Sequence, residues 1–418
     1  MKPSTTEKQF DRASFASRRT LRVLMIRFVV AGVHLFGEYT TRQLMALANR
    51  GHDVTYLIAR TQQSRMSTHK TPNFRLETVL LPKNTPVLSL ILFELMAFWR
   101  AMASISRYDA LILDVYSVPL LFPALVISRW RRPSLALLLR IESNPVETGG
   151  LLRSMGLSFL YALSIKLASV CFGKILFISP MLGQLYSRQF GIPADKVAVW
   201  PSSVDMAVFD PKCVTSVDHL RRELRLSDRL GVLYHGVLTR GRGIMELLEA
   251  FRILRDKHVK ATLVLLGYGP LRKKVIEEIQ ASHLEGVVRT CGPVDYSEVP
   301  RYISACDVEI NAVPDHPWWR YQCFIKVLEC LAMNKPLVVS DIPAHRWMIG
   351  NAPVAVYLRG TSPREIADGV IAFLRIRESL VPGIGRQLAS DFSAERVAED
   401  LESQMLSMIG KSVSPAGI

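Results

Sequence analysis

The stretch Ile325–Ser340 (IKVLECLAMNKPLVVS) combines a helix signal with a strand signal. Apolar residues surround Glu329 at helical spacing, and Asn334 and Pro336 then end that pattern, because proline lacks an amide hydrogen and clashes with the preceding turn. The run Leu337–Val339 is typical of a buried strand. We therefore expect a helix, a short turn and a strand, which would place Glu329 near the carboxyl edge of a parallel sheet, where open α/β folds bind ligands.

Lys326 precedes Glu329 by three residues and is expected on the same face of this helix. A cation that can meet a phosphate, next to a carboxylate that can meet a sugar hydroxyl, would suit a nucleotide sugar. A surface Lys–Glu pair explains the spacing equally well.

The composition fits a protein of two or three domains. The chain has 418 residues, of which 49% are hydrophobic, so it can bury a large core. Residues 1–19 are polar, lack an apolar signal region and are expected to be a disordered arm. No uncharged apolar run reaches the length of a membrane span. The six cysteines show neither CxxC nor metal-site spacing, so we expect reduced thiols, no metal and a cytoplasmic protein.

The positive charge is concentrated in the first half of the chain. Residues 1–205 carry 25 Lys and Arg against 12 Asp and Glu, a net charge of +13, whereas residues 206–418 carry 27 against 25. Aromatic residues are not interleaved with the basic ones, so we expect no nucleic-acid partner. An anionic membrane surface fits better, at the inner face of the membrane, although basic residues also simply favour solubility. The apolar stripe of a helix expected at Leu151–Val170 fits either core packing or a membrane surface.

Strands and helices alternate in both halves, as in doubly wound folds. After the strand Gly231–His235, the loop GVLTRGRG (Gly236–Gly243) leads into a helix and carries Arg240 and Arg242. A glycine-rich loop at a helix N-terminus offers amide groups to phosphate, and arginine matches phosphate geometry. The loop is interpreted as a phosphate site, with a solvated turn as the alternative.

Polar residues also follow strands in the first half. Arg140 and Glu142 come at the end of the strand expected from Ser134, and His34 lies in the loop after the first strand. The carboxyl ends of strands are where such a sheet places its chemistry. These three residues are candidate contacts to an acceptor, and ordinary loop polarity is the alternative.

Together these motifs resemble a retaining glycosyltransferase of family 4. The resemblance covers about Leu21 to Ile409 and is strongest in the second half. It rests on the following segments: GHDV (51–54), Ile178-Ser179, Gly191-Ile192, Lys196-Val197, Val204-Asp205, Phe209, Gly236 with Arg242-Gly243, GYGP (267–270), Gly292, Ala305-Cys306-Asp307 and KVLECLAMNKPLVVS.

The resemblance implies an α/β protein with the GT-B fold, in which two Rossmann-like domains face each other across a cleft. Residues 20–205 would bind the acceptor, with a C-terminal helix at 394–410 packing back on them, and residues 206–393 would bind the nucleotide sugar. Glu329 would hold the ribose. Arg242, with Arg240 or Lys326, would clamp the diphosphate without a metal, and Gly236, Gly243, Gly267 and Gly269 would line the donor site.

We therefore expect sugar transfer from a UDP- or GDP-sugar to a glycan or lipid-linked acceptor, with Arg242, Lys326 and Glu329 as the catalytic residues. Tyr321 stands where the family usually has a first glutamate, and Phe324 replaces a glycine. These departures leave open an inactive GT-B-shaped scaffold. A nucleotide-sugar epimerase is a weaker alternative.

Overall fold

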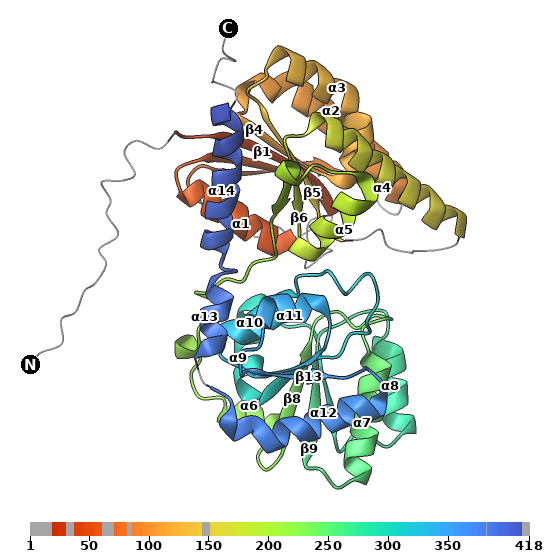
Figure 1. The fold of residues 1–418 in the computed structure, drawn as a ribbon. Coiled ribbons are helices and arrows are strands. Elements are labelled where there is room, and N and C mark those ends of the chain that lie inside the picture. Colours follow the sequence, from red (N-terminus) through yellow and green to blue (C-terminus); the bar gives the residue numbers. More distant parts are fainter. Residues whose placement is uncertain are drawn as a thin grey trace, which may run out of the picture.

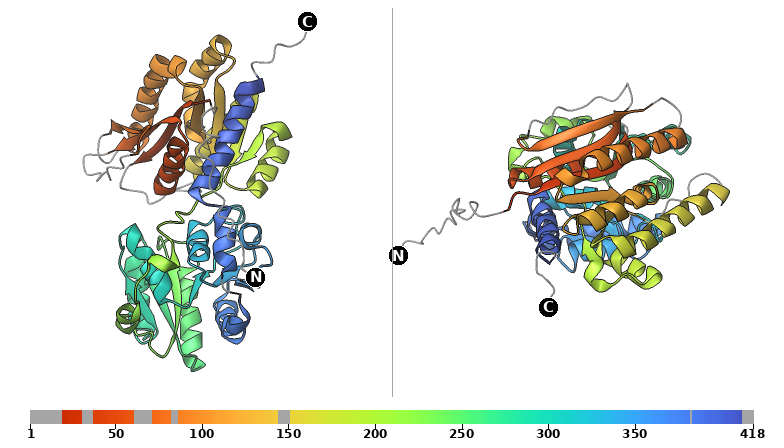
Figure 2. Two further views of the ribbon diagram at one scale, coloured as in Figure 1. Left: turned by 90° about the vertical axis from the view of Figure 1, so that its left-hand side faces the viewer. Right: turned by 90° about the horizontal axis from the view of Figure 1, so that it is seen from above.

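The computed structural model describes residues 19–30, 37–60, 71–81, 86–143, 151–381 and 383–411. Within these ranges the chain forms two parallel sheets, one in each half, and helices pack on both faces of each sheet (Figure 1). The side view in Figure 2 shows the two α/β units one above the other. The role expected for each unit stays a prediction.

The first sheet has seven strands in the order β3-β2-β1-β4-β5-β6-β7, all parallel. Every residue of β5 is buried, as expected for an inner parallel strand covered on both faces. The strands are β1 (Arg22–Val30), β2 (Asp53–Arg60), β3 (Phe74–Leu80), β4 (Ala110–Asp114), β5 (Ala136–Ile141), β6 (Lys174–Phe177) and β7 (Val197–Val199).

The two faces of the first sheet carry different helices. Val23 and Met25 point to the side of α1 and the C-terminal helix α14, whereas Leu24 and Ile26 point to the side of α2, α3 and α4, because successive strand residues face opposite ways. The helices of this unit are α1 (Gly37–Asn49), α2 (Pro86–Ser104), α3 (Val118–Arg131), α4 (Leu151–Cys171), α5 (Pro180–Phe190) and, from the end of the chain, α14 (Ala394–Lys411).

The second sheet has six parallel strands in the order β10-β9-β8-β11-β12-β13. Its strands are β8 (Leu230–His235), β9 (Ala261–Leu266), β10 (Val288–Cys291), β11 (Val308–Asn311), β12 (Leu337–Ser340) and β13 (Ala355–Leu358). The helices that follow β7 are α6 (Asp218–Glu223), α7 (Ile244–Asp256), α8 (Arg272–Ala281), α9 (Val299–Ala305), α10 (Ile325–Ala332), α11 (Pro343–Ile349), α12 (Pro363–Ile376) and α13 (Ile384–Ser390).

The helix, turn and strand expected at Ile325–Ser340 are confirmed as α10 and β12. Asn334 adopts a positive φ of 54° at the end of the helix. The amide of Lys335 then donates to the carbonyl of Cys330 at 2.8 Å. Asparagine tolerates this left-handed conformation better than most residues, which explains the sharp turn before Pro336.

The chain returns to the first unit through α13 and α14. Arg386 on α13 donates to the carbonyls of Ala332 and Met206, each at 2.9 Å, and so ties α10 to the segment between the two sheets. The carboxylate of Glu402 on α14 accepts a 2.6 Å hydrogen bond from Arg50, which directly follows α1. The last helix is thereby fixed to the first unit (Figure 1).

Candidate active site

The glycine-rich loops after β8 and β9 pack backbone against backbone. A Cβ atom on Gly267, whose φ is 143°, would lie 2.0 Å from the carbonyl oxygen of Gly236. On Gly269 it would lie 2.2 Å from the carbonyl of Leu238, and on Gly243 it would lie 2.3 Å from that of Ala312. Only glycine fits such approaches, so these positions let the backbones of the loops pack closely at the carboxyl end of the sheet.

Arg242 lies in this loop, directly before the N-terminus of α7. Its guanidinium is 4.9 Å from the ring centroid of Trp319. The indole of Trp319 in turn donates to the carbonyl of Gly241 at 2.8 Å, which fixes the ring beside the loop. Within the described residues the Nε of Arg242 is buried without a hydrogen-bond partner. The side chain therefore retains a free donor at a helix start that suits an anion.

Lys326 reaches the same place from α10. Its side chain is buried, its Nζ lies 3.6 Å from the ring centroid of Tyr234, and this nitrogen has no hydrogen bond among the described residues. Burial lowers the pKa of Lys326, Glu309 opposes this shift and Arg242 adds to it, and together these effects place the pKa at about 7. Burying an ammonium group without an acceptor costs folding free energy, and a bound anion would supply the missing acceptor for Lys326.

Glu329 lies one turn further along α10 and is bound by a histidine. His235, the last residue of β8, places Nε2 2.8 Å from Glu329 and Nδ1 3.1 Å from Glu309 of β11. Burial alone would lower the pKa of His235, but the two carboxylates raise it to about 9. The imidazolium therefore holds one oxygen of Glu329 in place.

The charge on His235 is expected to contribute to stability. Its raised pKa means that this contribution is complete below about pH 6.5 and is lost as the pH rises through about 9. We expect His235→Gln to lower the free energy of unfolding by about 3 kcal/mol at pH 6, a loss that should shrink toward pH 9.5. Urea titrations of both proteins at the two pH values measure the difference. His219→Gln, on an exposed histidine of α6, is the matched control. An equal loss at both pH values would contradict a charged His235.

The structure brings most of the expected donor residues together. Those at or beside the ends of β8 and β9 and on α10 are Gly236, Arg242, Gly243, Gly267, Gly269, Lys326 and Glu329. Arg240 is exposed at the tip of the loop. Sequence reasoning missed His235 and Glu309. The available signal was a charged or titratable residue in each of two buried strands, His235 at the end of β8 and Glu309 within β11.

A metal site is a weak interpretation of this cluster. His235, Glu309 and Cys330 place one ligand atom each within 4.8 Å of one another. However, the pKa of His235 is raised to about 9, and burial raises that of the Cys330 thiol well above its usual value. Neither group is therefore in its ligand form at neutral pH. The expectation of no metal stays a prediction.

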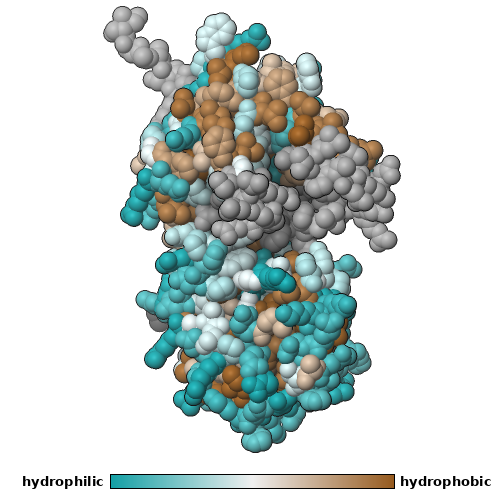
Figure 3. All heavy atoms as spheres, turned by 90° about the vertical axis from the view of Figure 1, so that its right-hand side faces the viewer, coloured by the Kyte–Doolittle hydropathy of each residue, from teal (hydrophilic) through white to brown (hydrophobic). Residues whose placement is uncertain are grey.

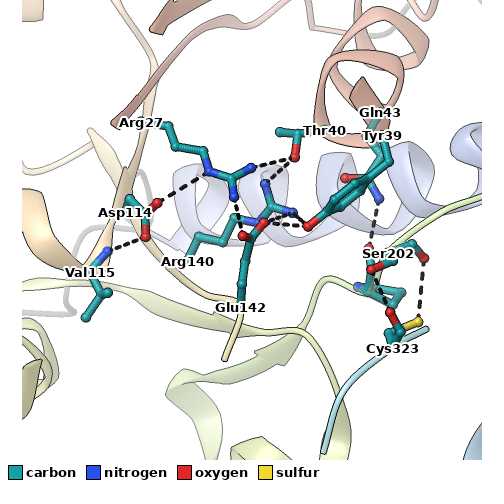
Figure 4. A network of polar contacts seen from close by, with 11 residues as sticks. Arg27, Tyr39, Thr40, Gln43, Asp114, Val115, Arg140, Glu142, Ser202 and Cys323 are labelled. Atoms are coloured by element: carbon teal, nitrogen blue, oxygen red, sulfur yellow. Dashed lines mark hydrogen bonds and ion pairs between the residues drawn. The ribbon is translucent and has the colours of Figure 1, made fainter. Parts of the chain in front are cut away.

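A second polar network occupies the carboxyl edge of the first sheet (Figure 4). Arg140 pairs with Glu142 at 2.7 Å and donates to the hydroxyl of Thr40 at 2.8 Å. Arg27 of β1 pairs with the same carboxylate and lies 3.4 Å from Asp114. Tyr39 donates to Oε1 of Glu142 at 2.6 Å, the same oxygen that Arg140 contacts, whereas Arg27 contacts Oε2.

The side chains of the first-sheet network mostly contact one another, although Nε of Arg140 has no hydrogen bond among the described residues. Arg140 is 1% exposed and stacks 4.2 Å from the ring centroid of Trp200. Glu142 keeps about a fifth of its side chain exposed. Of the three candidate acceptor residues, Glu142 is therefore partly exposed, and the buried side chain of Arg140 holds it in place. His34 lies outside the described residues. Their contact with an acceptor stays a prediction.

The carboxyl edges of the two sheets face each other. The hydroxyl of Ser179, which follows β6, donates to the carbonyl of Tyr321 at 2.6 Å. The hydroxyl of Ser202, after β7, donates to the carbonyl of Cys323 at 3.0 Å (Figure 4). Both acceptors lie in the loop that leads into α10, so the cluster on α10 lies close to the boundary between the two units.

This architecture is found in known enzymes. Sucrose-phosphate synthase of Thermosynechococcus elongatus superposes with a TM-score of 0.74 and 16% identity, over 94% of this chain and 100% of that one. HepE of Anabaena, solved in complex with UDP-glucose, superposes with a TM-score of 0.70 and 15% identity, over 93% and 100%. The chain has the GT-B fold.

The family match from sequence comparison lies in the second unit. Residues 229–375 match the family described as glycosyl transferases group 1. This range, about a third of the chain, contains all the expected donor residues of the GT-B fold together with His235 and Glu309. The alpha-D-kanosaminyltransferase of Streptomyces kanamyceticus is 27% identical over 186 residues, which are 44% of this chain and 47% of that protein. The chain thus spans about half the length of this curated relative.

Proposed function

We propose that this protein is a retaining glycosyltransferase of family 4 that transfers a sugar from a UDP- or GDP-sugar to a glycan or lipid-linked acceptor at the inner face of the membrane. The observation that carries the proposal is the buried Nζ of Lys326 beside the Arg242 loop, which has no hydrogen-bond partner within the described ranges. Two cations with free donors at a glycine-rich helix start form a receptor for a diphosphate.

The cations would act on the leaving group. As the bond from the sugar to the diphosphate breaks, negative charge builds up on the phosphate oxygens. Arg242 and Lys326 are held in place by Trp319 and Tyr234 before substrate arrives, so they need little reorganisation to stabilise that charge. A diphosphate next to Lys326 would also raise the pKa of this lysine and keep it protonated.

Glu329 would bind the ribose. One of its oxygens is engaged by His235, and the Tyr296 hydroxyl also contacts this carboxylate, a contact that a ribose hydroxyl would replace. The pair Glu309–His235 would thus position Glu329 rather than touch the substrate. The structural similarity to HepE, which was solved in complex with UDP-glucose, supports a uridine donor as the first to test.

Retention of configuration would follow from same-face attack. The departing phosphate oxygen can take the proton of the acceptor hydroxyl as that hydroxyl attacks the anomeric carbon from the face that the leaving group vacates. No separate base from the protein is then required. Glu142, at the facing edge of the first sheet, would bind the acceptor rather than carry its proton.

Calorimetry with UDP and GDP, followed by hydrolysis assays on a panel of their sugars, tests the proposal. We expect one nucleotide to bind with a micromolar Kd and one of its sugars to be released slowly in water. Failure of every nucleotide to bind would favour the scaffold, which Tyr321 and Phe324 motivate. A new nucleotide sugar formed without an acceptor would indicate the epimerase.

A further inference from the structure

The outer surface of α2, α3 and α4 is unusually apolar. Of the fourteen exposed large hydrophobic residues in the described ranges, eleven lie in the first unit, and ten of these are on the three helices. The side chains of Trp99, Trp130 and Phe159 are 71%, 82% and 69% exposed. Figure 3 shows the contrast: hydrophobic residues gather over the upper unit on this face, whereas the lower unit is mostly hydrophilic.

The helix α2 is apolar on both sides. Phe93, Ala97 and Ala101 are buried toward the sheet. Leu95 and Trp99, one turn apart, are exposed on the opposite side. A surface helix of a globular protein usually has a polar outer face, and a helix that is apolar all round is usually covered on all sides. Something outside the described chain is therefore expected to cover the outer face of α2.

The charges on the same helices are of one sign. Glu94 is the only acidic residue in the sequences of α2, α3 and α4, and its carboxylate is buried and accepts a 2.7 Å hydrogen bond from Ser117. Arg129 and Arg131 of α3 and Lys166 of α4 are exposed. The surface thus combines exposed tryptophans with cations and no exposed carboxylate.

We propose that the outer surface of α2, α3 and α4 docks on a bilayer that contains anionic lipids. Tryptophan favours the boundary between headgroups and acyl chains, and arginine can keep its charge among lipid phosphates while its stem lies on apolar surface. Each cation near an anionic surface strengthens binding by about fivefold. A second copy of the chain fits less well, since two such faces would bring like charges together. None of the helices in the described ranges is long and apolar enough to cross a membrane.

Docking through this surface would orient the molecule. The three helices cover one face of the first sheet, while α14 and α1 lie on the opposite face (Figure 1). The bilayer would therefore meet the unit that is expected to bind the acceptor and leave the second unit in the aqueous phase. The inference stands on surface chemistry alone, so it does not depend on the proposed transfer reaction.

Vesicle sedimentation with the full chain provides the test. The probes are vesicles of phosphatidylcholine alone and vesicles of phosphatidylcholine and phosphatidylglycerol in equal parts. We expect the wild-type protein to bind only the mixed vesicles. The double variant Trp99→Gln/Trp130→Gln should bind about tenfold or more weakly. The variant Arg129→Gln/Arg131→Gln should lose a similar factor at low salt and little at high salt, where screening already weakens the wild type.

Ile376→Gln/Val381→Gln is the matched control, because both residues are exposed hydrophobics of the second unit. This variant should bind as the wild type does, and thermal melting should show that all the variants fold. Failure of the wild type to bind mixed vesicles would overturn the proposal, as would undiminished binding by the tryptophan variant. A dimer in vesicle-free buffer that the tryptophan variant abolishes would also overturn it, since the surface would then bind a second copy.

Discussion

Replacing Arg242 by Gln is expected to lower kcat/KM for sugar transfer or donor hydrolysis by about 100- to 1,000-fold, or about 3–4 kcal/mol of transition-state stabilisation. The expected loss of activity follows from the position of the Arg242 guanidinium. Arg242 is held against Trp319 at the start of α7, and its Nε has no hydrogen-bond partner in the part of the chain that the structure describes. Gln keeps some polarity but removes the charge that the leaving diphosphate needs. Steady-state kinetics with the preferred nucleotide sugar measure the change.

The control for this variant is Lys273→Gln, on α8 of the same unit. Lys273 is 90% exposed, and its nearest carboxylate, on Glu277, is 3.8 Å away, so its loss should alter neither activity nor stability measurably. Arg242→Gln should also unfold at nearly the wild-type temperature, because its guanidinium makes no buried ion pair among the described residues. Wild-type turnover in Arg242→Gln would remove this residue from the active site.

The sequence was most informative where local signals agree with the fold. The α10–β12 stretch is such a case, because its periodicity, its turn residues and the proline that follows all indicate one structure. The loop Gly236–Gly243 is another, since its three glycines all adopt a positive φ and Gly243 also approaches the backbone of Ala312. The alternation of strands and helices predicted a doubly wound sheet in each half, whereas the GT-B fold was expected from the family resemblance.

The sequence was least informative about buried charge. His235 and Glu309 are at the end of one strand and inside another, and only the pairing of β8 with β11 makes them partners. Arg27 is likewise inside β1, and it meets Glu142 only because β1 and β5 both border β4. A charged residue within an apolar strand predicts that a partner exists, but the strand order decides which one it is. The sequence alone therefore could not identify Arg140 and Arg27 as a pair that shares one carboxylate.

Lys326→Met is expected to abolish most of the activity and yet to stabilise the protein. The folded state keeps the pKa of Lys326 at about 7, well below its ordinary value of 10.5, so a charged Lys326 costs folding free energy. A shift of this size corresponds to about 3–5 kcal/mol. Because the folded-state pKa is lowered, this cost is absent above about pH 10.5 and fully present below about pH 7. The stability gain of the variant should therefore be largest below pH 7 and should vanish toward pH 10.5, as denaturant titrations across this range would measure.

Lys335, close to Lys326 in the sequence, provides the control. It shows whether the stability gain and activity loss expected for Lys326→Met would follow the loss of any buried amine. Lys335, in the turn after α10, also has a lowered pKa, but its Nζ donates to the carbonyls of Ser304 and Cys306 at 2.9 and 2.8 Å. Lys335→Met removes two satisfied hydrogen bonds, so we expect it to destabilise the protein by about 1–3 kcal/mol and to leave kcat/KM nearly unchanged. Lys326→Met should instead lower kcat/KM by about 100-fold or more.

Two outcomes would contradict the role of Lys326 in diphosphate binding. These are a Lys326→Met variant less stable than the wild type at pH 6, and a Lys326→Met variant that retains full activity. Either result would mean that the amine stabilises the fold rather than binds a diphosphate. A binding site for an anion is the one place where a protein gains by keeping such a charge buried and unpaired, because the substrate supplies the missing partner.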